Sequence, residues 1–399
     1  NLFGVGCRYV VEGTSFLTAE PDEGSWAIAG VMRGPIRKET AYGVIPAGWK
    51  IFPTERKDQV SIRRTPGRVV NAERDLDRPF AVPAKTTVEY LWNLDDYVCG
   101  YPELTVGGGR GAKVEWAWTE SLRGADGKKG DRNAWQGKKV TECLEDVFLP
   151  DGRKSASFTT PWWRCGKWCR LRVTTADEPL EVRRIEIREE RYPLSFDAAF
   201  ACDDPSVSEI EKLCRRTMEN CCHEMLMDCP FYEQQMYPGD ILMSFAAMRT
   251  MTRDLRLPLQ GLGLFDAARM PSGLVPMNGP CRIDQRGSTW TLSWVACVGE
   301  LAMWGGEENL PWLKDRLPGV MHTLMSYARI ENEAGLLVDP PGWNFLDWTK
   351  GWEKSNYAPP NGLPGNGPDA CINLLYLQAM ERTVDLATAI GEDGLAAYW

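Results

Sequence analysis

The chain has 399 residues, of which 46 are lysine or arginine and 55 are aspartate or glutamate, giving a formal net charge of -9. A sequence pI near 5.1 argues against a nucleic-acid partner, because phosphates repel an acidic surface. The length exceeds the roughly 100–200 residues of one domain, and no apolar run approaches the roughly 20 residues of a membrane-spanning helix.

The first half of the chain is predicted to be β-structure. Val114, Trp116 and Trp118 alternate with smaller or polar residues, which is the period of a half-buried strand with an aromatic inner face. Residues 182–188 are similarly strand-like, and Gly-rich turns such as residues 107–111 separate these runs. Antiparallel sandwiches are favoured over βαβ units. We expect a separate or incomplete β domain over residues 1–80 and a β-sandwich domain over 81–197.

The hydrophobic period changes to that of a helix near residue 200. Asp204-Pro205, followed by Ser206 and Glu209, supplies an N-cap, a first-turn proline and a capping box. Residues 241–251 are apolar almost all round, so this helix is expected to be buried. Further helices are predicted near residues 258–270, 288–304, 311–330 and 369–390. Successive helices joined by long loops over residues 198–399 suggest a helical toroid.

The segment from Asp228 to Asp240 has the composition of an active-site loop. Its two prolines and Gly239 disfavour a continuous helix, and Gly239 is expected to allow a sharp turn before Asp240. Crowding of Asp228, Glu233 and Asp240 would raise a carboxyl pKa, and a protonated carboxyl can act as the general acid of glycoside hydrolysis. An equally weighted alternative is a polar loop whose two aspartates only cap flanking helices.

Several motifs resemble those of the bacterial α-L-rhamnosidases of glycoside hydrolase family 78. The pattern Asp228-Cys-Pro, Glu233, Gly239-Asp240 resembles the family signature, and Trp343-Asn-Phe-Leu-Asp-Trp348 resembles its pocket motif. Residues 92–106 and 170–173 resemble strands that precede its catalytic domain. The resemblance runs from about residue 85 to the end of the chain.

The resemblance implies N-terminal β-sandwich domains followed by an (α/α)6 barrel with the active site at its mouth. The helices visible in the sequence correspond to only the first half of such a barrel, over residues 198–399. We therefore expect either a fragment of a longer protein or a barrel that something else completes. The chain begins at Asn1 and shows no leader, so any signal peptide is expected to have been removed or never included.

The same resemblance assigns roles to individual residues. Glu233 corresponds to the general acid of an inverting mechanism, and Asp228 and Asp240 correspond to groups that hold the rhamnose hydroxyls. The family's general base comes from a late barrel loop, expected beyond Trp399. Asp347 corresponds to a residue of the sugar pocket.

Rhamnose is a 6-deoxy sugar, so its site needs an apolar wall for the methyl group, which Tyr237, Trp343 and Trp348 could supply. Core packing is an equally weighted interpretation for the two tryptophans. Many family members carry an arginine and a tryptophan where this chain has Tyr232 and Tyr237, two further predicted substrate-binding residues. An arginine offers a fork of donors that tyrosine lacks, so a related deoxy sugar or a different aglycone stays open.

The predicted function is inverting hydrolysis that releases terminal α-L-rhamnose from rhamnosides or polysaccharides. One alternative is a non-catalytic carbohydrate-binding protein on a hydrolase scaffold, against which the retention of Glu233 counts. Another is an (α/α)6 hydrolase for another deoxy sugar or a uronide, but no arginine or lysine lies between residues 228 and 240. The expected partner is a carbohydrate, with no nucleic acid and no membrane. The oligomeric state stays open, as does the choice between a bacterial periplasm and cytoplasm.

Neither a cofactor nor a metal is indicated, because inverting hydrolysis needs only two carboxyl groups and water. The 13 cysteines show no repeated Cys-x-x-Cys pair. We expect most of them to be free, buried thiols, including Cys214 and Cys221 on an apolar helix face. His223 and His322 are predicted to be packed or solvated, because no ligand spacing surrounds either of them.

Overall fold

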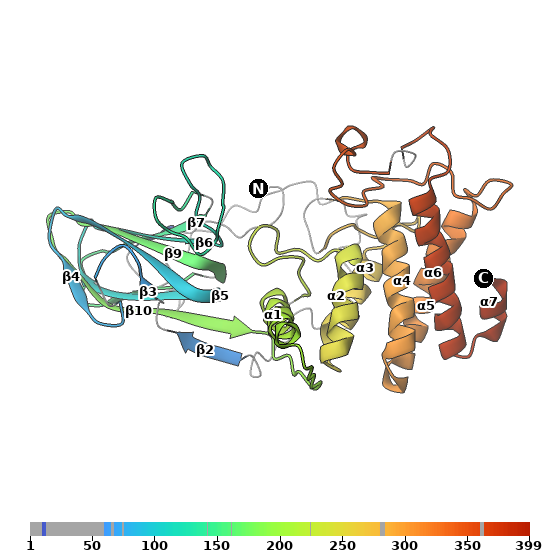
Figure 1. Cartoon of the computed structure of the whole chain (residues 1–399), viewed down its shortest axis with the longest axis horizontal. Helices are drawn as coiled ribbons and strands as arrows, with labels where there is room; N and C mark the ends of the chain where they lie inside the picture. Colours follow the sequence, from blue (N-terminus) through green and yellow to red (C-terminus); the bar gives the residue numbers. More distant parts are fainter. Residues whose placement is uncertain are drawn as a thin grey trace, which may run out of the picture.

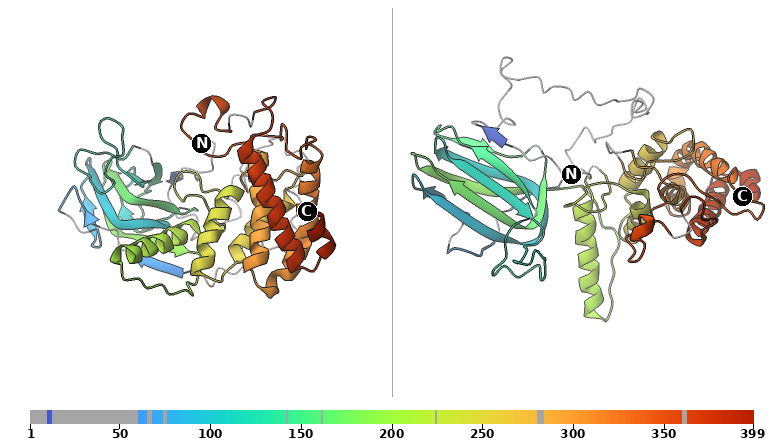
Figure 2. Two further views of the ribbon diagram at one scale, coloured as in Figure 1. Left: turned by 45° about the vertical axis from the view of Figure 1, so that its right-hand side comes forward. Right: turned by 90° about the horizontal axis from the view of Figure 1, so that it is seen from above.

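A computed structural model of the chain describes residues 10–12, 60–64, 68–73, 76–141, 143–160, 162–223, 225–279, 284–359 and 363–399. A part built from strands and a part built from helices lie side by side along the longest axis (Figure 1). Helix α1 (Pro205–Cys221) lies between them, and the two views of Figure 2 show the same division.

One large sheet forms the first part. Its main strand order is β1-β7-β6-β9-β5-β10-β2, and β3, β4 and β8 pair beside this path. The described pairings are antiparallel except for that of β1 with β7, so the predicted antiparallel β-structure is confirmed. Most of the predicted domain 1–80 lies outside the described residues. The strands are β1 (Val10–Glu12), β2 (Val60–Arg64), β3 (Arg68–Val69), β4 (Phe80–Val82), β5 (Thr87–Gly108), β6 (Lys113–Thr119), β7 (Leu144–Leu149), β8 (Ala156–Phe158), β9 (Arg164–Thr174) and β10 (Leu180–Arg191).

Strand β5 joins the two halves of the sheet. It is 22 residues long, pairs with β9 over residues 87–100 and pairs with β10 over residues 100–108. The β9 pairing shifts register between Asn93 and Val98. Tryptophans on one face fill the core: Trp92 meets Trp116 edge-on at 5.6 Å, and Trp116 stacks with Trp118 at 6.3 Å.

Strand β6 is more buried than its alternating sequence predicts. Trp116 and Trp118 are buried as expected, but Ala117 and Thr119, on the opposite face, are buried too. Thr119 pairs with Trp168 of β9, and Leu122 from the following segment packs with that tryptophan. The prediction of a half-buried strand is therefore wrong, because the chain after β6 folds back over the second face.

The predicted helices are present. In addition to α1 they are α2 (Pro238–Met251), α3 (Arg256–Ala267), α4 (Ser288–Trp304), α5 (Leu310–Ala328), α6 (Ala370–Ala389) and the short α7 (Asp393–Tyr398), with 3-10 turns at Glu307–Asn309 and Glu353–Ser355. Helix α4 is buried along most of its length and packs against both α2 and α6. In the part of the chain that the structure describes, no helix has the length and apolarity to cross a membrane.

Two helices are less buried than expected. Met243 of α2 is 72% exposed, so only one face of that helix is buried, and the prediction of burial all round is wrong. In α1, Cys221 is buried as predicted, but Cys214 is exposed and Ile210 is 57% exposed. The first half of α1 extends past the sheet in the right-hand view of Figure 2, which agrees with the exposure of these two side chains.

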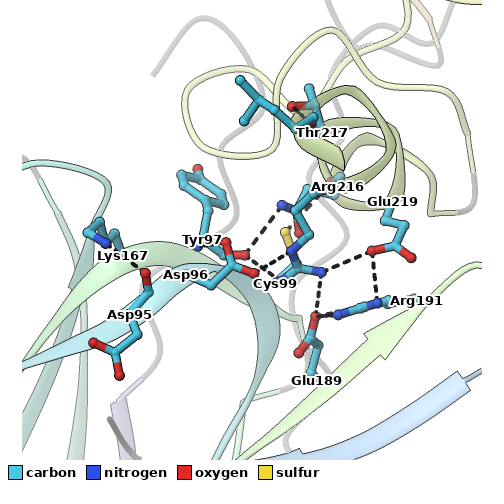
Figure 3. A network of polar contacts seen from close by, with 12 residues as sticks. Asp95, Asp96, Tyr97, Cys99, Lys167, Glu189, Arg191, Arg216, Thr217 and Glu219 are labelled. Carbon is cyan, nitrogen blue, oxygen red and sulfur yellow. Dashed lines mark hydrogen bonds and ion pairs between the residues drawn. The ribbon is translucent and has the colours of Figure 1, made fainter. Parts of the chain in front are cut away.

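A charged network ties α1 to the sheet (Figure 3). Arg216 of α1 contacts Asp96 of β5 at 2.7 Å and Glu189 of β10 at 2.9 Å. Its Nη2 also donates to the backbone oxygen of Tyr97 at 2.6 Å. Arg191 shares the Glu189 carboxylate at 2.7 Å, and the Glu189 side chain is only 1% exposed. One arginine thus bridges the helical part to two strands.

Candidate active site

A cavity of about 480 Å³ opens where the first turns of α2 and α4 meet the segment 343–348. The segment between α5 and α6 runs over this end of the helices (Figure 1). Seven of the predicted site residues line the cavity: Asp228, Glu233, Tyr237, Asp240, Trp343, Asp347 and Trp348. The structure therefore brings together two motifs that lie about a hundred residues apart in the chain.

Tyr232 is the predicted site residue that does not line this cavity. Its ring faces the sheet part, where the Lys129 ammonium lies 4.6 Å from the ring centroid. Lys129 also forms an ion pair with Glu120 at 2.7 Å. Tyr232 therefore contacts a loop of the sheet part, beside the cavity.

The acid-bearing loop closes on itself through Asp228. The Asp228 N–H donates to the backbone oxygen of Gln235 at 2.9 Å, and the Gln235 N–H donates to Asp228 Oδ1 at 3.1 Å. Neither Asp228 nor Asp240 is the N-cap of a described helix, because Asp204 caps α1 and Tyr237 precedes α2. The alternative that these aspartates only cap helices is therefore wrong.

Burial changes the protonation chemistry of the loop. It raises the pKa of Asp228 to about 6, with a smaller contribution from the charge of Glu233. Burial, followed by the charge of Asp228, raises the pKa of Asp240 to about 6. Crowding was the cause that the sequence suggested, but desolvation is the larger one in both cases. The cavity can therefore hold protonated aspartates near pH 6.

Tyr237 orients the central carboxyl group. Its hydroxyl donates a hydrogen bond to Glu233 Oε2. Burial, together with that bond, raises the pKa of Tyr237 well above its ordinary value, so the hydroxyl keeps its proton. Glu233 is thus held by a neutral donor while its side chain lines the cavity.

Aromatic rings form one wall of the cavity. Phe345 lies 4.9 Å from Trp343, 5.0 Å from Trp348 and 5.9 Å from Trp290, measured between ring centroids. Trp290 and Phe345 were not predicted as site residues. An aromatic residue at the start of a buried helix, or inside a Trp-rich motif, resembles ordinary core, and no local pattern separates the two.

Gly239 has a different role from the predicted sharp turn. It is the second residue of α2 and has no positive φ, so the turn prediction is wrong. A Cβ atom at this position would lie 2.4 Å from a ring carbon of Trp290. The glycine is required for close approach of an aromatic wall to the helix.

Neither His223 nor His322 lines the cavity, and His223 is packed, as one of the two predicted environments. The His223 ring stacks on Trp163 at 4.1 Å, and burial lowers the pKa of His223 to about 4. His322 Nε2 lies 3.0 Å from the Pro271 oxygen. Within the described ranges, no group of three or more histidine, cysteine or acidic side chains is placed to hold a metal ion.

Residues 196–399 match the family described as the bacterial alpha-L-rhamnosidase 6 hairpin glycosidase domain. The chain belongs to this family. The matched rhamnosidase domain contains both cavity motifs and all the described helices. No curated protein sequence matches the chain.

Solved rhamnosidases share its fold. The family 78 rhamnosidase of Bacillus sp. GL1 superposes with a TM-score of 0.67 at 23% identity, over 82% of this chain and 33% of that one. A Klebsiella oxytoca rhamnosidase with rhamnose bound superposes with a TM-score of 0.67 at 15% identity, over 85% of this chain and 68% of that one. A Streptomyces avermitilis alpha-L-rhamnosidase complexed with L-rhamnose superposes with a TM-score of 0.57 at 17% identity, over 84% of this chain and 30% of that one. The chain thus spans about a third of the length of the Bacillus protein.

Proposed function

We propose that this chain forms the terminal-rhamnose site of a glycoside hydrolase that cleaves α-L-rhamnosides with inversion, with Glu233 as the general acid. The observation that carries the proposal is that three carboxyl groups share a single cavity: Asp228 and Glu233 from the loop before α2, and Asp240 from the first turn of α2. In an inverting mechanism the acid protonates the leaving oxygen while a separate carboxylate activates water. Asp347 belongs to the sugar-binding groups in this proposal and is not the base.

The sugar would be recognised by two kinds of surface. Asp228 and Asp240 offer carboxyl oxygens to the ring hydroxyls. Trp343 and Trp348 offer apolar surface to the ring face and the 6-methyl group. Support for rhamnose comes from family membership and from the rhamnose bound in two proteins of the same fold. Tyr232 would act outside the sugar pocket, next to the leaving group.

We propose that the chain has the domain architecture that the family resemblance implies. The sheet would form a β-sandwich domain over residues 81–197, preceded by a β domain over 1–80. The helices of residues 198–399 would form the first half of an (α/α)6 barrel. In support, the pairs α2–α4 and α4–α6 are in close contact, and the cavity lies at the end where α2 and α4 begin.

The test uses the full-length protein and its Glu233→Gln variant, with Glu307→Gln at an exposed position as the matched control. Each is incubated with p-nitrophenyl α-L-rhamnoside and with a rhamnose-containing disaccharide, and proton NMR follows the anomer released. We expect the wild type and the control to release β-rhamnose first. The Glu233→Gln variant should lose the disaccharide reaction, which depends on leaving-group protonation.

Two results would contradict the proposal. Initial release of α-rhamnose would exclude inversion. No turnover by the wild type, together with rhamnose binding in a titration, would favour the carbohydrate-binding alternative.

A further inference from the structure

Glu233 and its neighbour Gln234 serve opposite sides of the loop. Glu233 lines the cavity, whereas Gln234 is only 7% exposed and makes its contacts elsewhere. Gln234 Oε1 accepts a hydrogen bond from Trp162 Nε1 at 2.9 Å, and its Nε2 donates to the Pro230 oxygen at 2.9 Å. The side chain of Gln234 thus connects its residue both to the sheet part and to the rest of its own loop.

The backbone at Gln234 needs such a constraint. Its φ is +55°, in the left-handed region that non-glycine residues rarely occupy. A residue held there persists only when its surroundings determine its conformation. If Gln234 relaxed to an ordinary φ, the preceding residue, Glu233, would rotate away from Tyr237. The orientation of the carboxyl group therefore depends on what holds Gln234.

The sheet part supplies that constraint at two points. Trp162 precedes β9, and its ring stacks on Trp163, which in turn stacks on the buried His223. Cys165 of β9 adds a second contact, because its Sγ donates to the Pro230 oxygen at 2.7 Å. Both contacts reach the short stretch 230–234, and neither Trp162 nor Cys165 lines the cavity.

We propose that Trp162 and Gln234 are positioning residues for Glu233: the sheet part sets the orientation of the acid through the indole–amide hydrogen bond. The inference rests on the proposed function, because it assumes that Glu233 is the acid. Trp162 itself does not line the cavity. Its effect should therefore appear in proton donation and not in sugar binding.

Trp162→Phe removes the indole donor while keeping an aromatic ring. The kcat for the rhamnose disaccharide should fall by about tenfold or more, since small misplacements of a catalytic group are costly. The kcat for p-nitrophenyl rhamnoside should change less than about twofold, because nitrophenolate leaves with little acid assistance. The KM values should stay unchanged for both substrates.

Trp168→Phe is the matched control. Trp168 of β9 is fully buried, whereas Trp162 is half-buried, and the Trp168 Nε1 donates to the Arg132 oxygen at 2.9 Å, away from the acid loop. This variant should leave both kcat values as in the wild type. A general loss of stability would lower both activities together and would not separate the two substrates.

Gln234→Met probes the same bond from its other side and should reproduce the selective loss, and the double variant should be no worse than the more damaging single one. Equal losses on both substrates, or no loss on the disaccharide, would overturn the positioning role. A wild type inactive on both substrates would instead overturn the proposed function itself, so the two failures are distinguishable.

Discussion

The ring of Trp290 lies against the backbone of Gly239, and a Cβ atom at residue 239 would be 2.4 Å from it. We predict that Gly239→Ala lowers the free energy of unfolding by about 1–3 kcal/mol, as overpacking does in other cores. The displaced ring should also weaken rhamnose binding. Calorimetric melting and a rhamnose titration measure the two effects.

Gly394→Ala is the control for this variant. Gly394 lies in α7, and nothing is within 4 Å of its Cβ position. Alanine there should be neutral or slightly stabilising. Unchanged melting of Gly239→Ala would mean that the Trp290 ring can move aside at little cost.

Stability should fall as the pH rises from about 4 to about 6. The pKa of Asp228 and of Asp240 is about 6 in the folded chain, against an ordinary value of 3.8. The folded state therefore binds more protons than the unfolded state in this window, and that advantage is lost as both groups ionise. Asp228→Asn and Asp240→Asn should each raise the free energy of unfolding at pH 7.5.

We expect a gain of about 1–2 kcal/mol for each of these variants, after allowing for their partial exposure. The gain should vanish near pH 4, where the wild-type carboxyls are already protonated. Melting temperatures at the two pH values measure it, with the exposed Asp315→Asn as the control. A gain that is equal at both pH values would contradict the titration argument.

Removing Arg216 should loosen the junction between α1 and the sheet. Arg216→Met leaves the Glu189 carboxylate, 1% exposed, with less compensation, and we expect a loss of about 3–5 kcal/mol in unfolding free energy. Lys212→Met is the control on the same helix. The Lys212 side chain is 68% exposed and that of its partner Glu209 is 72% exposed, so their ion pair should contribute under about 1 kcal/mol to the unfolding free energy. Urea unfolding and the rate of proteolysis within residues 192–204 measure the two effects. Equal effects of Arg216→Met and Lys212→Met would contradict the prediction.

Trp348 can be tested as a sugar-contacting residue because it is 64% exposed. Trp348→Ala should weaken rhamnose binding about tenfold, equivalent to roughly 1.4 kcal/mol, with little change in melting temperature. Trp304→Ala, at a residue that is 56% exposed and outside the cavity, should change neither the affinity nor the reaction. An unaltered rhamnose affinity of the Trp348→Ala variant would mean that Trp343, and not Trp348, provides the apolar contact with the sugar.

The helices could be predicted because their signals are local. Asp204 accepts from the Ser206 N–H as the predicted cap of α1 should, with Pro205 in the first turn. Pro238 was expected to disfavour a helix, but it occupies the first turn of α2, where its missing N–H would have no helical partner. Asp369 caps α6 through the N–H groups of Cys371 and Ile372. Each signal lies within a few residues of the boundary that it sets.

The remaining features depend on distant contacts. Gly239 meets Trp290, Gln234 meets Trp162, and the second face of β6 is covered by a later segment. No period or motif encodes such pairs, because either partner alone is compatible with many environments. Seven of the cavity residues were predicted with the help of the family resemblance, whereas Trp290, Phe345 and the contacts that hold the site required the structure.

The central position of β5 has a kinetic consequence. Thr87 pairs with Thr174, and Gly108 pairs with Leu180, so each of these two pairs joins residues more than seventy positions apart in the chain. Sheets with such separated pairings form slowly, whereas helical turns form from neighbouring residues. Trp162 and Cys165, which hold the acid loop, belong to this slower part. During refolding we therefore expect helical content to return before the loop acquires its final shape, so that catalytic competence lags behind the circular dichroism signal.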